Sequence, residues 1–148
     1  MNMGALPPSL AEIVDMFATS PPRDRLELLL EYSQSLPPLP ARLAEHPERL
    51  EAVPECQSPL FVAAEVDENR RVHLYMDAPP EAPTTRGFAG IFHAGLDGLA
   101  ADEVLAVPGD VTARMALAEV VSPLRLRGAA ALLGRVQRQV SEQLSSVS

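Results

Sequence analysis

The sequence predicts an α+β fold in which helices pack on one face of a small antiparallel sheet of three strands. Apolar residues recur at helical spacing near both ends of the chain, whereas the middle contains a short apolar run at residues 60–66 and a segment at residues 71–76 that alternates with the period of two typical of strands. The 148 residues match the size of one domain, and 47% of them are hydrophobic, which suffices for a core. No repeat or linker divides the chain. We therefore expect one domain over residues 1–148, in the order helices, β-meander, helices.

The first two elements are predicted to form a helical hairpin. The stripe of the first helix consists of Leu10, Ile13, Val14 and Phe17. Ser20 is expected to cap the second helix, with Pro21 at its first position. One face of the second helix is predicted to contain Leu26, Leu29, Leu30 and Ser33. The proline-rich segment 37–40 ends this helix, because proline cannot continue the hydrogen-bond ladder.

Three strands are expected in the middle of the chain. Residues 60–66 and 71–76 form two strands, and the second alternates so that Val72, Leu74 and Met76 share one face. The polar segment 67–70 supplies the turn between them. A third, short strand is predicted at residues 50–53.

The last third of the chain is predicted to be helical. Thr84 or Thr85 is expected to cap a helix with an apolar stripe that consists of Phe88, Ile91, Phe92 and Leu96. Glycine is unfavourable inside a helix, so we interpret Gly87, Gly90 and Gly95 as points of close packing against the sheet. Further helices are expected at 102–107, at 111–120 and from Ser122-Pro123 to about Gln143, with residues 145–148 as a frayed tail.

Composition and charge exclude several classes of function. The net charge of −8 opposes nucleic-acid binding, which depends on cationic contacts with phosphates. All twelve basic residues are arginine, so no lysine can hold pyridoxal phosphate as a Schiff base. No apolar run approaches the roughly 20 residues that span a bilayer, and residues 1–8 show no signal-peptide pattern. With one free cysteine, these features predict a cytoplasmic protein with no membrane partner.

Cys56, the single cysteine, is the candidate reactive residue. It lies in a polar segment bracketed by prolines, in the loop expected between the strands at 50–53 and 60–66. A reactive thiol needs some exposure and a controlled pKa, whereas an inert cysteine packs as a small hydrophobe. The loop favours the first interpretation, and the residue count alone favours the second. If Cys56 does chemistry, another molecule must supply the second sulfur.

The histidines provide no clear catalytic partner for this thiol. His46, His73 and His93 show no spacing to a further ligand, so no zinc site is expected. A cysteine-dependent hydrolase or transferase would need a histidine base and an oxyanion site, and neither can be assigned from the sequence.

Two arginines stand at an unfavourable place in the last predicted helix. Arg125 and Arg127 fall in its first two turns, where the helix dipole disfavours cations by about 0.3–1 kcal/mol. We interpret them either as surface residues, with Glu119 as partner, or as cations that face an acidic partner or a thiolate.

Several motifs, spread in order over residues 10–142, together indicate a family. They are Ser35-Leu36-Pro37-Pro38-Leu39, Val53-Pro54-Glu55-Cys56-Gln57-Ser58, Arg86-Gly87-Phe88, Gly98 with Asp102-Glu103-Val104-Leu105, and Ser122-Pro123-Leu124-Arg125 with Gly128. This set resembles the SufE family of sulfur-acceptor proteins in iron–sulfur cluster assembly. The second motif resembles the loop around the family's acceptor cysteine, and the last resembles its Ser/Thr-Pro-x-Arg-x-x-Gly helix opening.

The resemblance implies an α+β fold shared with IscU-type scaffolds. It also implies that Cys56 accepts persulfide sulfur from a SufS-like cysteine desulfurase and passes it to a scaffold such as the SufBCD complex. Arg125 is implied to lie near the acceptor loop and to stabilise the thiolate or persulfide. The residues expected to contact the partner are Glu55, Gln57, Ser58 and Arg86. The chain is expected to hold neither cofactor nor metal, since pyridoxal phosphate stays with the desulfurase, and to act as its acceptor and activator rather than as an enzyme.

The chain departs from the family beside its cysteine. Glu55 stands where glycine is common, Pro59 where a polar residue is usual, and Phe61 where tryptophan is common. A negative charge beside a thiol opposes thiolate formation, and proline stiffens the loop. These departures leave open a rhodanese-type sulfurtransferase as donor, and a structural adaptor with an incidental cysteine as a further alternative. Apolar residues on both sides of the loop favour a sheltered resting position for Cys56.

Overall fold

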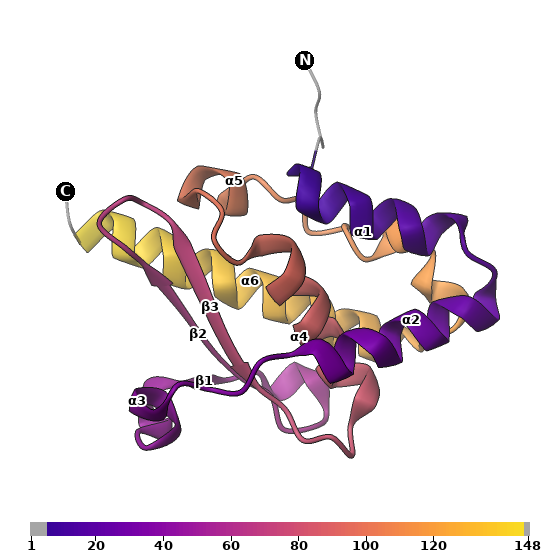
Figure 1. Cartoon of the computed structure of the whole chain (residues 1–148), viewed down its shortest axis with the longest axis horizontal. Coiled ribbons are helices and arrows are strands. Elements are labelled where there is room, and N and C mark those ends of the chain that lie inside the picture. Colours follow the sequence, from indigo (N-terminus) through magenta and orange to yellow (C-terminus); the bar gives the residue numbers. More distant parts are fainter. Residues whose placement is uncertain (1–5, 147–148) are drawn as a thin grey trace.

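The computed structural model describes residues 6–146, which form the predicted α+β fold (Figure 1). Residues 1–5, which belong to the N-terminal segment without a signal-peptide pattern, lie outside the described residues. The helices are α1 (Pro8–Thr19), α2 (Pro22–Ser35), α3 (Ala41–Ala44), α4 (Pro83–Leu96), α5 (Ala101–Leu105) and α6 (Pro123–Ser146). The strands are β1 (Glu51–Ala52), β2 (Phe61–Val66) and β3 (Val72–Asp77). Short 3-10 turns are η1 (Pro47–Arg49), η2 (Pro54–Cys56), η3 (Ala113–Met115) and η4 (Leu117–Glu119).

The sheet is the predicted antiparallel meander, with strand order β1-β2-β3. Val72, Leu74 and Met76 are all buried on one face of β3, as their alternation predicts. The turn at 67–70 is also confirmed, because the Asp67 carboxylate accepts two backbone N–H groups there. The predicted strand at 50–53 is present but shorter, and its two residues lie at the edge of the sheet.

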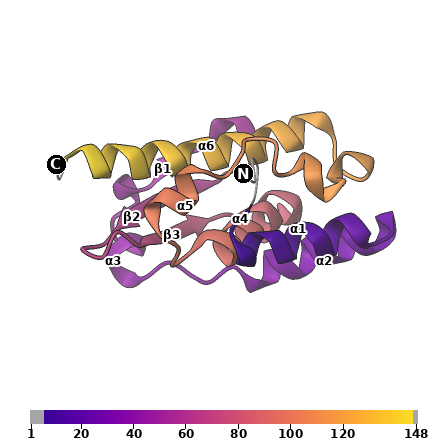
Figure 2. The same cartoon turned by 90° about the horizontal axis from the view of Figure 1, so that it is seen from above.

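Helix α4 is the centre of the helical layers. Figure 2 shows α6 on one side of the molecule and α1 with α2 on the other, with the sheet and α4 between them. Helix α4 contacts β3, α6, α1 and α2, and its predicted stripe is completely buried. No helix between residues 6 and 146 is long and apolar enough to cross a membrane.

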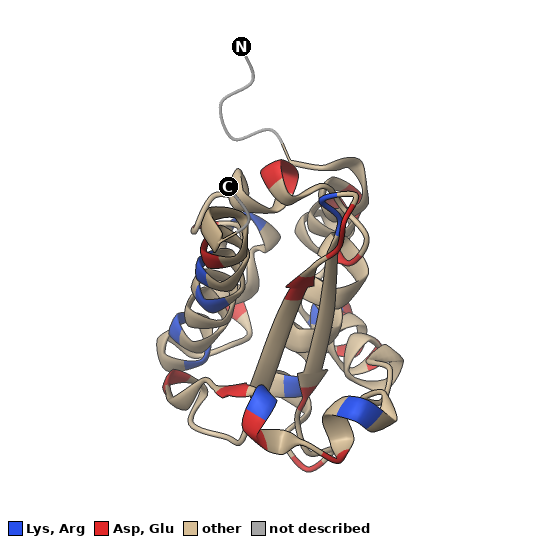
Figure 3. Ribbon diagram, turned by 90° about the vertical axis from the view of Figure 1, so that its left-hand side faces the viewer, with Lys and Arg blue, Asp and Glu red and all other residues tan. Residues whose placement is uncertain are grey.

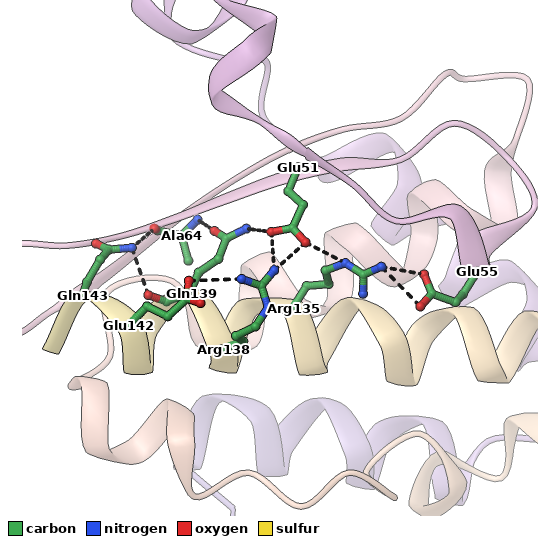
Figure 4. Close-up of polar contacts among 8 residues, drawn as sticks. All are labelled: Glu51, Glu55, Ala64, Arg135, Arg138, Gln139, Glu142 and Gln143. Atoms are coloured by element: carbon green, nitrogen blue, oxygen red, sulfur yellow. Dashed lines mark hydrogen bonds and ion pairs between the residues drawn. The ribbon is translucent and has the colours of Figure 1, made fainter. Parts of the chain in front are cut away.

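Glutamines of α6 bind the part of β2 that β1 does not reach (Figure 4). Gln139 Oε1 accepts the Ala64 N–H at 2.7 Å, and Gln143 Oε1 accepts the Val66 N–H at 2.8 Å. Gln143 Nε2 donates in turn to the Ala64 carbonyl at 2.6 Å. The outer backbone groups of this strand are therefore paired with side chains instead of another strand.

The glycines of α4 pack closely, but against helices rather than against the sheet as predicted. A Cβ atom at Gly90 would lie 2.0 Å from the carbonyl oxygen of Tyr32, and one at Gly87 would lie 2.6 Å from that of Leu29. Gly95 faces α1 in the same way. The correction follows from the position of α4, which lies between the sheet and the N-terminal hairpin and turns its glycines toward the hairpin.

The buried face of α2 also differs from the prediction. Leu29 and Ser33 are buried as expected, but Leu26 and Leu30 are 49% and 47% exposed, and Arg25 is buried in their place. The close contact with the α4 glycines fixes the rotation of α2, and this rotation turns the two leucines outward.

Residues 111–120 do not form the predicted helix. They form the two 3-10 turns η3 and η4, because Ala116 between them adopts a left-handed conformation with φ 56°. Its carbonyl accepts Arg25 Nη1 at 3.2 Å, while Arg25 Nε donates to the Phe17 carbonyl at 3.0 Å. The same guanidinium binds Glu119 at 2.9 Å, so the carboxylate considered as a partner of the surface arginines is bound elsewhere.

The predicted caps of α2 and α4 are wrong. Helix α2 begins at Pro22, and Ser20 donates its hydroxyl to a carbonyl at the end of α1 instead. Helix α4 begins at Pro83, ahead of Thr84 and Thr85, and no side chain caps it. A first-turn proline has no N–H to satisfy, which lowers the need for a capping side chain.

Helix α6 begins and ends close to its predicted limits. The Ser122 hydroxyl accepts the Arg125 N–H at 3.3 Å, as expected of the N-cap. The helix continues past Gln143 to Ser146, and only residues 147–148 of the expected frayed tail lie outside the described residues.

Candidate functional site

Cys56 ends the short turn η2 between β1 and β2, in the loop that the sequence predicts. Its N–H donates to the Val53 carbonyl at 3.1 Å, and the next N–H, of Gln57, donates to the Pro54 carbonyl at 3.2 Å. Gln57 has left-handed backbone angles, with φ 63° and ψ 0°. Such angles cost a non-glycine residue on the order of 1 kcal/mol, so the surrounding contacts must hold the turn in place.

The thiol is buried, although its polar loop alone suggests partial exposure. Cys56 is 6% exposed and belongs to the hydrophobic core with Val53 and Leu60. Its Sγ donates to the Gly128 carbonyl of α6 at 3.4 Å. The sheltered resting position favoured by the apolar flanks of the loop is confirmed, because the turn directs the side chain inward onto α6.

Gly128 provides the space for this position. A Cβ atom there would lie 2.8 Å from the Cα atom of Cys56, 3.0 Å from its Sγ and 3.2 Å from the Glu55 carbonyl oxygen. Separations this short force one of the two segments to move. The glycine of the Ser-Pro-x-Arg-x-x-Gly motif is therefore the point at which α6 accommodates the cysteine turn.

The environment of Cys56 keeps its thiol protonated. Burial is the larger cause and the neighbouring Glu55 carboxylate the second, and together they raise the thiol pKa to about 11. The guanidinium groups of Arg135 and Arg125 oppose this rise, in that order. Only about one molecule in ten thousand then carries a thiolate at pH 7. The resting site protects the thiol rather than activating it.

Glu55 is not an isolated negative charge, because Arg135 of α6 binds it (Figure 4). Arg135 Nη2 lies 3.0 and 3.3 Å from the two Glu55 carboxylate oxygens, and Arg135 Nε lies 2.9 Å from Glu51 Oε2. Glu51, at the start of β1, also binds Arg138 and Gln139. Burial raises the pKa of Glu51, but hydrogen bonds from Gln139 and Arg138 outweigh it and hold the pKa below the usual value. Figure 3 shows α6 with its arginine positions, beside the sheet.

Arg135 is the site residue that sequence reasoning missed. It follows Gly128 by seven residues, or two turns, so both residues lie on the same face of α6. That spacing, with an unexplained acidic residue beside the cysteine, is the signal that points to it.

The other predicted site residues fall into two groups. Around the thiol, Glu55 and Gln57 are exposed and Ser58 is half-buried, while the Arg125 guanidinium is half-buried and forms no ion pair within residues 6–146. Arg86 has a role in the fold: its guanidinium donates to three backbone carbonyl groups that join the ends of α2 and β3 to α4. These carbonyl groups belong to Ser33, Leu36 and Ala78.

The chain belongs to the SufE family. Its sequence matches the SufE family model, described as an Fe-S metabolism associated domain, over residues 11–140. An uncharacterized SufE-like protein of Mycobacterium tuberculosis is 51% identical over 138 residues, which cover 93% of this chain and 95% of that protein. One from Synechocystis is 26% identical over 129 residues, covering 86% of this chain and 77% of that protein. The solution structure of a hypothetical protein from Thermus thermophilus has a TM-score of 0.84 and 40% identity, and the match covers 95% of this chain and 99% of that one.

Membership confirms the resemblance drawn from the motifs and gives this SufE-family protein a role in iron–sulfur metabolism. None of the three histidines is placed as a base for the thiol. Each imidazole lies beside a carboxylate, in the pairs His46 with Glu48, His73 with Asp67, and His93 with Asp97. Among residues 6–146, no group of three His, Cys, Asp or Glu residues is arranged to hold a metal ion.

A separate hollow of about 460 Å³ lies away from the thiol. It is lined mainly by apolar side chains of the 37–50 segment together with Phe61, Met76 and Arg86. Its lining includes neither Cys56 nor the charged residues Glu55, Arg125 and Arg135.

Proposed function

We propose that this SufE-family protein is a sulfur carrier that accepts persulfide sulfur on Cys56 from a cysteine desulfurase and delivers it to an iron–sulfur cluster scaffold. The observation that carries the proposal is the position of the thiol. The single cysteine of the chain lies on a short turn between two strands, and that turn rests on α6 where the helix has a glycine. Such a turn can move outward without disrupting either the sheet or the helix.

The transfer has the form of a thiol–disulfide exchange. The Cys56 thiolate attacks the outer sulfur of the donor persulfide, a new S–S bond forms on Cys56, and the donor S–S bond breaks. The donor cysteine leaves as a thiolate, and the outer sulfur keeps its proton as it moves to Cys56, so charge and electrons balance. Delivery repeats the step with Cys56 as donor. The chain has no second cysteine that would attack the persulfide and release sulfide.

The buried resting state suits a carrier that must react with one partner only. With a pKa of about 11, the thiol reacts slowly with small oxidants and electrophiles near neutral pH. Docking of the donor supplies proximity, which contributes several kcal/mol, and draws the turn outward into water, where the pKa returns toward the ordinary value. Arg125, whose guanidinium already favours the thiolate, then stabilises the thiolate or persulfide anion.

The donor we favour is a SufS-like enzyme that carries the pyridoxal phosphate, so that the chain itself needs no cofactor and acts as acceptor and activator. The scaffold is SufBCD-like, and the setting is the cytoplasm. Exposed Glu55 and Gln57, which flank Cys56 in the chain, and half-buried Ser58 are the proposed contacts with these partners. Arg86, which is half-buried, is the remaining proposed contact.

The test is transfer of sulfur measured by intact mass. The protein is incubated with a pyridoxal-phosphate cysteine desulfurase and L-cysteine, and a carrier gains about 32 Da, the mass of one sulfur, on Cys56. Cys56→Ser should gain nothing. A parallel arm uses a rhodanese-type sulfurtransferase with thiosulfate, and a gain in this arm alone would replace the desulfurase as donor. A protein that gains no mass in either arm is an adaptor with an incidental cysteine.

A further inference from the structure

Arg135 connects the cysteine turn to both the sheet and α6. Its guanidinium reaches forward to Glu55, the residue before Cys56, at 3.0 Å and back to Glu51, the first residue of β1, at 2.9 Å. Its side chain is 22% exposed, less than either carboxylate. One side chain of α6 therefore holds both ends of the segment that leads from β1 to the thiol (Figure 4).

The two carboxylates do not hold Arg135 equally. Glu51 is fixed from several sides, since it also accepts Gln139 Nε2 at 2.9 Å and pairs with Arg138. Glu55 is held by Arg135 alone among residues 6–146, and it is the more exposed of the two carboxylates. If the turn moves outward, Glu55 leaves and Arg135 keeps Glu51, so no partly buried charge loses its last partner. Opening the outer pair removes the two hydrogen bonds from Arg135 to Glu55 and leaves Arg135 in its ion pair with Glu51.

Other contacts of the turn do not replace this pair. The remaining links of the turn to α6 are the 3.4 Å thiol hydrogen bond to Gly128 and the packing around it. A thiol is a weak donor, and the left-handed Gln57 works against the closed turn.

We propose that Arg135 is a positioning residue of the sulfur-transfer site: by bridging Glu51 and Glu55 it keeps the Cys56 turn closed, and separation of Glu55 from Arg135 accompanies exposure of the thiol. The proposal deepens the sulfur-carrier function and rests on it for its biological meaning. The closed and open turn are measurable without any sulfur donor, so this proposal and the carrier function can fail independently.

The charge of the thiol is a competing explanation that the variants separate. The charged groups that face Cys56 are Glu55, Arg135 and Arg125. Glu55→Gln removes an anion, which lowers the thiol pKa, whereas Arg135→Gln removes a cation, which raises it. If the Arg135–Glu55 ion pair holds the turn closed, both variants open the turn. If the residues act only through the thiol charge, the two variants shift its reactivity in opposite directions.

Hydrogen exchange of the backbone amides of Cys56 and Gln57 reports the turn independently of thiol ionisation. We expect exchange to accelerate about two- to fivefold in Glu55→Gln and in Arg135→Gln, the range for losing an exposed ion pair. The double variant should exchange no faster than the faster single one, because both remove the same interaction. Arg135→Lys, which keeps the charge, should recover part of the protection. Iodoacetamide labelling over a range of pH then gives the thiol pKa and the exposure of the sulfur separately.

Glu142→Gln is the matched control, because it removes an exposed carboxylate that pairs with Arg138 on the same helix but does not contact the turn. It should leave exchange at residues 56 and 57 unchanged. Thermal unfolding followed by circular dichroism checks that each variant is folded. Exchange that stays at the wild-type rate in folded Glu55→Gln, or labelling pKa shifts of opposite sign with no change in exchange, would overturn the proposal.

Discussion

The replacement of Gly128 by alanine tests directly whether the cysteine turn rests on α6. The new Cβ atom would lie 2.8 Å from the Cα atom of Cys56 and 3.0 Å from its Sγ. Carbon atoms are in favourable contact at about 3.5–4.0 Å. The turn must therefore retreat from the helix by about 1 Å, since the contacted atoms include backbone that cannot rotate away.

Gly134→Ala provides a matched control on the same helix. Gly134 is exposed, and a Cβ atom there meets nothing within 4 Å. This variant should gain about 0.5–1 kcal/mol in the free energy of unfolding, because alanine is the better helix former. Gly128→Ala has a similar gain, but overpacking costs about 1–3 kcal/mol. Gly128→Ala should consequently be the less stable variant by about 1–3 kcal/mol, or about 3–9 °C in melting temperature.

Two measurements decide the outcome. Urea or thermal unfolding gives the stability difference between the variants, and iodoacetamide labelling at constant pH gives the accessibility of Cys56. We expect faster labelling in Gly128→Ala than in wild type and no change in Gly134→Ala. Equal stability of the two variants, together with equal labelling rates, would refute the reasoning that Gly128 makes room for the turn.

Three further predictions concern the thiol and the fold. Because burial and Glu55 raise the pKa of Cys56 to about 11, iodoacetamide labelling should accelerate about tenfold per pH unit between about pH 7 and 10, and a plateau near pH 8.5 would contradict this. The thiol pKa of about 11 in the folded state is also higher than the ordinary value of about 8.5 in the unfolded state. The stability that follows from this difference is complete below about pH 8.5 and is lost as the pH rises to about 11. Urea midpoints should therefore fall more steeply over this pH range in wild type than in Cys56→Ala. Arg86→Ala should lose about 2–4 kcal/mol in urea unfolding, since three carbonyl groups lose a charged donor, while Arg86→Lys recovers only part of it; a loss below about 0.5 kcal/mol would show that Arg86 does not hold the fold.

Local patterns predict the parts of this structure that depend on neighbouring residues. The alternation at Val72, Leu74 and Met76 predicts β3 and its buried face, because side chains of a strand point alternately to its two sides. The polar segment around Cys56 predicts the turn for a similar reason, since prolines and short polar side chains disfavour a continuous strand.

Contacts between distant segments decide the remaining features. Leu26 and Leu30 have the spacing of a buried face, but the glycines of α4 fix the rotation of α2 and leave both leucines exposed. Ala116 interrupts a helical pattern with its left-handed backbone, and its carbonyl accepts a guanidinium that lies 91 residues earlier in the chain.

The candidate site shows the same division. Cys56 is evident from the sequence, whereas the partner of its neighbour Glu55 lies 80 residues away on α6. The inward direction of the thiol also depends on α6, through Gly128. Sequence reasoning therefore finds the candidate thiol with Glu55 and Arg125, but not Arg135 or the contact of Gly128 with the thiol.

The glutamines that bind β2 have a consequence for how this protein meets others. An uncovered strand edge invites another chain to add a strand, by pairing in a complex or by aggregation. Gln139 and Gln143 already use the backbone groups of Ala64 and Val66, so an incoming strand would have to displace both side chains. This end of β2 is thereby closed to strand exchange unless both glutamine side chains are displaced.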